Sequence, residues 1–196
     1  MSFFYKRNID VNIKELQHQI AVYEDQSAYK TLFFLLFPSL QNFAFSIVKS
    51  RVLAEEIASD MLLEVWIRRQ KLMEIENLKL YLFVGAKRGA LNKLKQENRH
   101  SKFCLGDLHV EFISDYINPE ESAELHELQT KISKAVKELP PACQLIYKLA
   151  KEDRLKYKEI AQLLDLSIKT IDHQLAIALK KIAQSLHFYP DKKNIL

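Results

Sequence analysis

The stretch Tyr157–Lys181, YKEIAQLLDLSIKTIDHQLAIALKK, decides the fold of the C-terminal part of this chain. Ile160, Ala161 and Leu164 recur at helical spacing, and the apolar pattern resumes on a second helix after Asp165. The small side chain of Ala161 suits a close crossing of two helices that are joined by a short turn. The pattern therefore predicts a helix-turn-helix.

Two residues are expected to form the turn between these helices. Asp165 stands where glycine is usual, and we expect it to adopt the left-handed conformation, which aspartate tolerates better than most residues. Ser167 is expected to cap the second helix, because its hydroxyl can accept a hydrogen bond from a backbone N–H of the first turn.

The second helix carries polar side chains that we expect to point away from the packed face. Such side chains can bind base edges and phosphates in the major groove of DNA. A solvated face on an ordinary helical hairpin is the alternative, so the motif favours DNA binding but does not decide it. The predicted DNA-facing residues are Ser167, Lys169, Thr170, Asp172, His173 and Gln174.

The composition predicts an all-α chain. Its 196 residues include only 3 Gly and 5 Pro, and apolar residues recur at spacings of three and four almost throughout. We find no basic leader with an apolar run and no stretch approaching the roughly 18 apolar residues of a membrane span, so we expect a cytoplasmic protein. Cys104 and Cys143 lack partners at metal-ligand spacing, and we expect reduced, structural thiols. No catalytic constellation, metal site or cofactor motif is visible.

The formal net charge is +4, and its distribution divides the chain. The segment 79–102 is strongly basic, whereas the segment 106–124 contains six acidic residues and neither lysine nor arginine. Helix-breaking residues in the acidic segment favour a linker. We therefore expect two small helical domains, 1–100 and 123–196, joined by a flexible acidic linker at 101–122.

The N-terminal half is predicted to form successive amphipathic helices, over Asn12–Glu24, Ser27–Phe37 and Pro38–Lys49, with a fourth from about Val52. The fourth helix has a wide apolar face beside an acidic stripe of Glu56, Asp60 and Glu64. A core face beside a solvated face explains this pattern, but so wide an apolar face can also bind a partner.

The segment KLMEIEN, Lys71–Asn77, is expected to be a loop before a basic helix over Leu78–Gln96. Tyr81 and Phe83 lie close to the basic residues of this helix, and single-stranded nucleic acid binds such combinations of aromatic rings and cations. Phe83 is expected in the core. For Tyr81, burial and exposure remain equally open.

The order of these segments resembles the extracytoplasmic-function group of sigma factors in the sigma-70 family, over about residues 18–186. FPSLQNFAFSIVKSRVLAEEIASDMLLEVW (37–66) is similar to the family's polymerase-binding segment, and LKLYLFVGAKRGALNKLKQ (78–96) to its promoter-melting helix. LPPACQLIYKLAKEDRLKYKEIAQLLDLSIKTIDHQLAIALKKI (139–182) is similar to its −35 domain and is the most specific match. The resemblance implies a non-enzymatic protein that directs promoter-specific transcription initiation.

The resemblance also implies roles for individual residues. It implies that core RNA polymerase binds this chain through the coiled-coil of its largest subunit, at Asp60, Leu63, Glu64 and Trp66. The loop 71–77 corresponds to the segment that captures a flipped −10 base, with Asn77, Lys79 and Tyr81 as the candidates. The helix along the opened strand is implied to use Lys87, Arg88, Asn92 and Lys95.

Two positions depart from the family pattern, which usually has Asn at Arg88 and Asp at Asn92. Both departures make the helix more basic and favour phosphate binding over base reading. Further implied partners are the β flap of the polymerase, promoter DNA and an anti-sigma factor that is often membrane-anchored, with no small-molecule substrate.

Two other classes of protein are compatible with parts of the sequence. A one-component transcriptional regulator has a similar C-terminal helix-turn-helix, although the basic N-terminal helix argues against a sensor domain. An all-helical interaction scaffold would carry the basic regions as solvated faces.

Overall fold

The computed structural model describes residues 12–96 and 123–186, and all regular elements in these ranges are helices. The chain divides into two compact units, Met1–Phe103 and Cys104–Leu196. The predicted all-α fold is confirmed. The predicted linker 101–122 lies outside the described residues.

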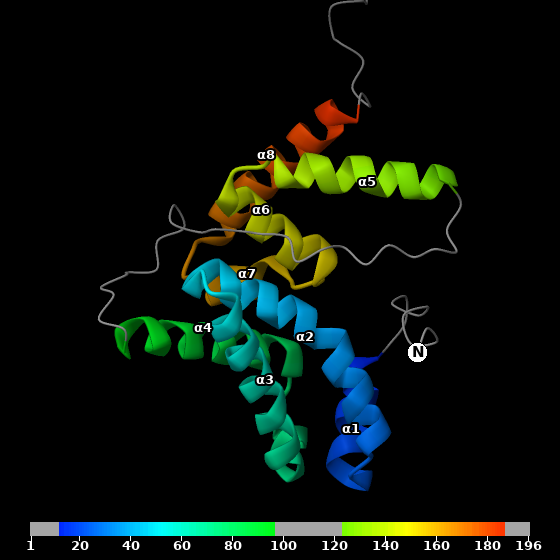
Figure 1. Ribbon diagram of the computed structural model, residues 1–196, viewed down its shortest axis with the longest axis vertical. Coiled ribbons are helices and arrows are strands. Elements are labelled where there is room, and N and C mark those ends of the chain that lie inside the picture. Colours follow the sequence, from blue (N-terminus) through cyan, green and yellow to red (C-terminus); the bar gives the residue numbers. More distant parts are fainter. Residues whose placement is uncertain (1–11, 97–122, 187–196) are drawn as a thin grey trace, which may run out of the picture. The chain divides into compact units, whose positions relative to one another are not determined.

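The N-terminal unit is a helical bundle whose elements follow one another with short connections (Figure 1). Its elements are α1 (Ile13–Tyr23), α2 (Gln26–Val48), α3 (Arg51–Ile67), the 3₁₀ helix η1 (Arg69–Glu74) and α4 (Leu78–Gln96).

The long helix α2 packs against α1, α3 and α4 and forms the centre of this unit. Its fully buried Leu32 and Leu40 lie in the core, and Phe43 meets Phe83 of α4 edge to face, with ring centroids 5.2 Å apart. The predicted core position of Phe83 is confirmed, since its side chain is fully buried.

The predicted helix break at Pro38 is wrong, because α2 continues through this residue. Proline in a helix interior removes one backbone hydrogen bond and costs about 3 kcal/mol. Leu36 and Leu40 on either side are both buried, and their burial offsets this cost at roughly 1.5–3 kcal/mol per side chain. Hydrophobic burial therefore overrides the local preference.

The expectation that no segment is apolar enough to span a membrane also needs correction. Within the described residues, α2 has 23 residues and a mean hydropathy of 1.6 over 18 of them, which suffices by length and composition alone. Half of this 18-residue stretch is buried inside the unit, against the neighbouring helices. The same apolar character is expected of the central helix in a bundle.

The segment Lys71–Asn77 is only partly a loop. Lys71–Glu74 belong to η1, and only Ile75, Glu76 and Asn77 connect it to α4. Leu72 explains the difference, because its side chain is 1% exposed and anchors a helical turn in the core.

The C-terminal unit consists of α5 (Ala123–Lys137), α6 (Pro141–Tyr147), the π-helix η3 (Lys148–Glu152), α7 (Tyr157–Leu164) and α8 (Ile168–Ser185). One hydrophobic cluster joins α5, α6 and α8 through Val136, Leu139, Cys143, Ala178 and Ile182. The C-terminal half of α8 is thereby fixed to the unit, while its N-terminal half packs against α7.

Candidate nucleic-acid interface

The predicted helix-turn-helix is present as α7 and α8. Asp165 ends α7 in the left-handed conformation, with φ 56° and ψ 44°, and the Leu166 N–H donates to the Ala161 carbonyl over 2.9 Å. Ser167 caps α8, since its Oγ accepts a hydrogen bond from the Thr170 N–H over 3.0 Å. Both turn predictions are confirmed.

The exposed face of α8 carries most of the predicted DNA-facing residues. Lys169, Asp172 and His173 are exposed, whereas Ile171 and Leu175 on the opposite face are buried. Ser167 is exposed but its hydroxyl also caps the helix, and Thr170 is half-buried, with its hydroxyl 2.8 Å from that of Ser167. The exposed side chains offer donors and acceptors of the kind that bind base edges and phosphates.

Gln174 differs from the prediction, because its side chain turns toward α6. Its Oε1 accepts a hydrogen bond from the Cys143 thiol at 2.9 Å. Burial raises the pKa of Cys143, which keeps the thiol protonated and able to donate at neutral pH. The separation of 31 residues between the two side chains left no local signal of this contact.

One face of the basic helix α4 carries polar and charged side chains around two apolar ones. Arg88, Asn92 and Lys95 are exposed and Lys87 is half-buried. These four side chains line a shallow groove on α4, together with the half-buried side chains of Val84 and Leu91. The structure thus brings together the four residues predicted to lie along an opened DNA strand. Cations beside an apolar strip can neutralise phosphates while bases rest on the strip.

The three candidates for base capture lie around the start of α4. The Asn77 side chain caps this helix, since its Oδ1 accepts a hydrogen bond from the Leu80 N–H over 3.0 Å. Tyr81 is 36% exposed, which answers the open question of its position, and Lys79 is half-buried. Asn77 therefore has a structural role that a substitution would also remove.

The predicted polymerase-binding residues lie on α3 in different environments. Asp60 is exposed and Leu63 is 50% exposed, whereas Glu64 is half-buried and pairs with Arg68 at 2.9 Å. Ile67, one turn after Leu63, is 66% exposed and extends the apolar stripe. Sequence analysis missed Ile67, although its spacing of four from Leu63 was a usable signal.

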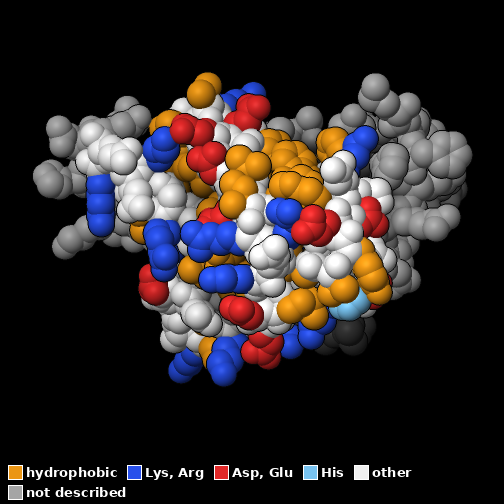
Figure 2. All heavy atoms as spheres, turned by 90° about the horizontal axis from the view of Figure 1, so that it is seen from below, with side chains coloured by type: hydrophobic (Ala, Val, Ile, Leu, Met, Phe, Trp, Pro, Cys, Tyr) orange, Lys and Arg blue, Asp and Glu red, His pale blue; other side chains and the backbone are white. Residues whose placement is uncertain are grey.

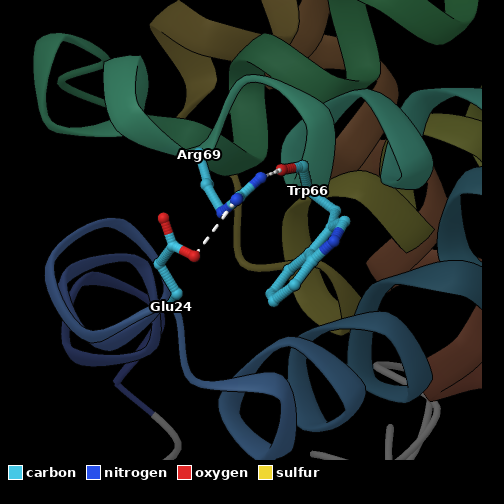
Figure 3. A network of polar contacts seen from close by, with 3 residues as sticks. All are labelled: Glu24, Trp66 and Arg69. Atoms are coloured by element: carbon cyan, nitrogen blue, oxygen red, sulfur yellow. Dashed lines mark hydrogen bonds and ion pairs between the residues drawn. The ribbon is translucent and has the colours of Figure 1, made fainter.

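Trp66 is largely occupied by contacts within the unit. Its ring centroid lies 5.1 Å from that of the Tyr29 ring of α2, and the Arg69 guanidinium lies 5.0 Å from the indole centroid. Arg69 also donates to the Trp66 carbonyl and pairs with Glu24 at 3.1 Å (Figure 3). Trp66 is consequently a packing residue beneath the surface of α3, and it adds little to the exposed apolar stripe of Leu63 and Ile67.

A space-filling view shows hydrophobic side chains gathered in patches on one face of the molecule, with Lys and Arg side chains beside them (Figure 2). Among the described residues, no group of three or more His, Cys, Asp or Glu side chains is arranged to hold a metal ion.

The comparisons with known proteins address the helix-turn-helix directly. Residues 129–182 match the family model described as "Sigma-70, region 4". The match covers most of α5, all of α6, η3 and α7, and most of α8. This part of the chain is similar to region 4 of the sigma-70 family. Members of this family are sigma factors, which direct RNA polymerase to start transcription at specific promoters.

The fold of this chain is similar to that of a solved structure described as the sigma factor RpoE in complex with the anti-sigma factor NepR, from Bartonella quintana. The TM-score is 0.51 and the sequence identity 21%, over 83% of this chain and 98% of the other. At this identity the likeness supports the fold. No curated protein matches the sequence.

Proposed function

We propose that this chain is a sigma factor, whose N-terminal unit binds core RNA polymerase and holds the melted −10 element, while its C-terminal unit reads the −35 element. We assign residues 1–100 and 123–196 to these two domains and 101–122 to the linker between them. The exposed polar face of α8, fixed behind the Asp165 turn, is the observation that carries the proposal.

The −35 assignment rests on which α8 side chains are free to reach DNA. Lys169, Asp172 and His173 stand exposed on the first two turns after the Ser167 cap, where recognition helices contact base edges. We place Ser167 and Thr170 at the DNA backbone, since their hydroxyls are already engaged at the cap. Gln174 is assigned a packing role against Cys143 instead.

The −10 assignment rests on α4 and the turn before it. The groove lined by Lys87, Arg88, Asn92 and Lys95 suits a single strand, because it combines positive charge with apolar surface. A flipped base would bind near Asn77, Lys79 and Tyr81, where a half-exposed aromatic ring supplies a stacking surface.

The polymerase-binding surface is proposed to centre on Asp60, Leu63 and Ile67 of α3, flanked by Glu64. Exposed apolar side chains separated by one helical turn are typical anchors of protein interfaces. We further propose that the protein acts in the cytoplasm without enzymatic activity of its own. An anti-sigma factor, such as the one bound by the similar RpoE structure, is the proposed regulator.

Run-off transcription with purified core polymerase tests the proposal. On a promoter selected by the holoenzyme, His173→Ala should reduce the transcript about tenfold, because a good base contact discriminates by about 1–3 kcal/mol. Gln184→Ala is the matched control, since Gln184 lies exposed on the same helix beyond the recognition turns. A transcript that does not depend on the added chain would exclude a sigma factor role.

Charge reversal tests the polymerase interface separately. Asp60→Lys should weaken retention of the chain on immobilised core polymerase, while Glu55→Lys, the same charge reversal at another exposed position of the helix, should not. Equal retention of both variants and the parent chain would remove α3 from the proposed interface.

A further inference from the structure

Helix α1 makes polar contacts with residues 69–75, the segment that precedes α4. Gln17 lies in the middle of α1 and is 5% exposed, although glutamine is usually a surface residue. Its Nε2 donates to two backbone carbonyls across the unit, those of Leu72 and Ile75, the latter over 2.8 Å. Both hydrogens of one buried amide group are therefore used to hold the end of η1.

These two carbonyls define the shape of the turn into α4. The Ile75 N–H donates to the Leu72 carbonyl over 3.0 Å, which closes the last turn of η1. Gln17 bridges the same carbonyl to the carbonyl of Ile75. Asn77, the cap of α4 and a proposed base-capture residue, follows only two residues later.

A second contact fastens the other end of η1 to α1. Arg69, the first residue of η1, pairs with Glu24 at the C-terminal end of α1 over 3.1 Å (Figure 3). The same guanidinium donates to the Trp66 carbonyl over 3.1 Å. Helix α1 thus holds η1 at its start through Glu24 and at its end through Gln17.

We propose that α1 is the support of the −10 base-capture segment and that Gln17 is a positioning residue for promoter opening. The inference rests on the proposed function of the turn at Asn77. Gln17 does not reach DNA in this account. It fixes the backbone at Leu72 and Ile75, so that Asn77 and Tyr81 stand ready before the base leaves the stack, and less ordering is required at the moment of capture.

The choice of substitution follows from this geometry. Gln17→Met keeps the length and unbranched shape of the side chain but removes both donors. The packing is therefore retained, while the buried Leu72 carbonyl and the partly buried Ile75 carbonyl each lose a hydrogen bond. Gln19→Met is the matched control, because Gln19 lies on the same helix and its side chain hydrogen-bonds only to Glu15 of that helix among the described contacts.

The first measurement uses the free, full-length chain and requires no polymerase. Hydrogen exchange of backbone amides in residues 69–77 should become about tenfold faster in Gln17→Met. The two lost hydrogen bonds stabilise the closed state of this segment, so without them the local opening equilibrium should rise by about that factor. Exchange in α2 should stay unchanged. Unaltered exchange in residues 69–77 would overturn the support role, whatever the chain does at promoters.

The second measurement uses holoenzyme on one promoter with each of the four bases placed in turn at the flipped position. The parent chain should prefer one base, and Gln17→Met should reduce that preference about tenfold while Gln19→Met preserves it. A role in overall stability would lower opening on all four templates by the same factor, and that result would overturn the proposal. If the parent chain opens no promoter, the proposed function is refuted instead. The hydrogen-exchange measurement on the free chain then still tests whether Gln17 supports residues 69–77.

Discussion

The crossing of α3 and α4 provides a quantitative test, because two glycines of α4 meet different neighbours on α3. Gly85 and Gly89 both lie inside the helix, and neither has a positive φ. Replacing either with Ala should gain about 0.5–1 kcal/mol from helix propensity. The two substitutions should therefore differ only in what the added methyl group meets.

At Gly89 the methyl group fits. Its carbon would lie 3.4 Å from Cγ2 of Ile57, which is close to an ordinary contact. Gly89→Ala should stabilise the N-terminal unit by about 0.5–1 kcal/mol, which raises its unfolding midpoint by roughly 2–8 °C for a unit of this size.

At Gly85 the methyl group collides with Met61. Its carbon would lie 2.2 Å from Cε and 2.8 Å from Sδ of that side chain, so the methionine must move. Because these atoms are the flexible end of a half-buried side chain, the cost should be about 1 kcal/mol, at the low end for overpacking. After subtraction of the propensity gain of about 0.5–1 kcal/mol, Gly85→Ala should destabilise the unit by about 0–0.5 kcal/mol, whereas Gly89→Ala stabilises it.

Denaturant unfolding of the full chain, followed by circular dichroism, measures both effects. A double-mutant cycle with Met61→Ala isolates the collision: in that background Gly85→Ala should become stabilising by about 0.5–1 kcal/mol. Equal effects of the two Gly→Ala substitutions, or the same Gly85→Ala effect with and without Met61, would refute the α3–α4 crossing described above.

Other predictions concern the two units separately. Ser167→Ala should lower the free energy of unfolding of the C-terminal unit by about 1 kcal/mol through loss of the α8 cap, and Ser167→Asp, measured in the same denaturant titration, should retain it. Lys87→Ala and Arg88→Ala should each reduce the slope of log affinity against log salt for single-stranded −10 DNA by about 0.7, as measured by fluorescence anisotropy, whereas an unchanged slope would remove that cation from the DNA contact. In a Cys104→Ser background, Cys143 should react slowly with iodoacetamide near pH 8 and fast after unfolding, because burial raises the pKa of the thiol and hides it; rapid reaction in the native chain would contradict the Cys143–Gln174 contact.

Elements with a strong periodic signal were predictable from the sequence. The helix-turn-helix followed from apolar spacing and turn chemistry, since the left-handed Asp165 and the Ser167 cap are both local features. The same reasoning failed at Pro38, because the burial of Leu36 and Leu40 depends on packing partners far away in the sequence.

The candidate site was predictable as faces but not as individual contacts. The family resemblance singled out Lys87, Arg88, Asn92 and Lys95, and the structure has these four side chains on one face of α4. The engagement of Gln174 with Cys143 and of Gln17 with η1 depends on which helices meet, which no local pattern encodes. These tertiary hydrogen bonds separate a side chain that faces DNA from one that holds the structure.

Permanganate footprinting of promoter DNA tests the central claim most directly. With purified core polymerase, a chain that holds the melted −10 element should make thymines near −10 reactive on the non-template strand, and Tyr81→Ala should reduce that reactivity unless the −10 bubble is premelted. Premelting provides in advance the unstacking free energy of a few kcal/mol that base capture must otherwise offset. A promoter that the holoenzyme binds and that shows no reactive thymine would contradict the account and favour a transcriptional regulator that binds only duplex DNA.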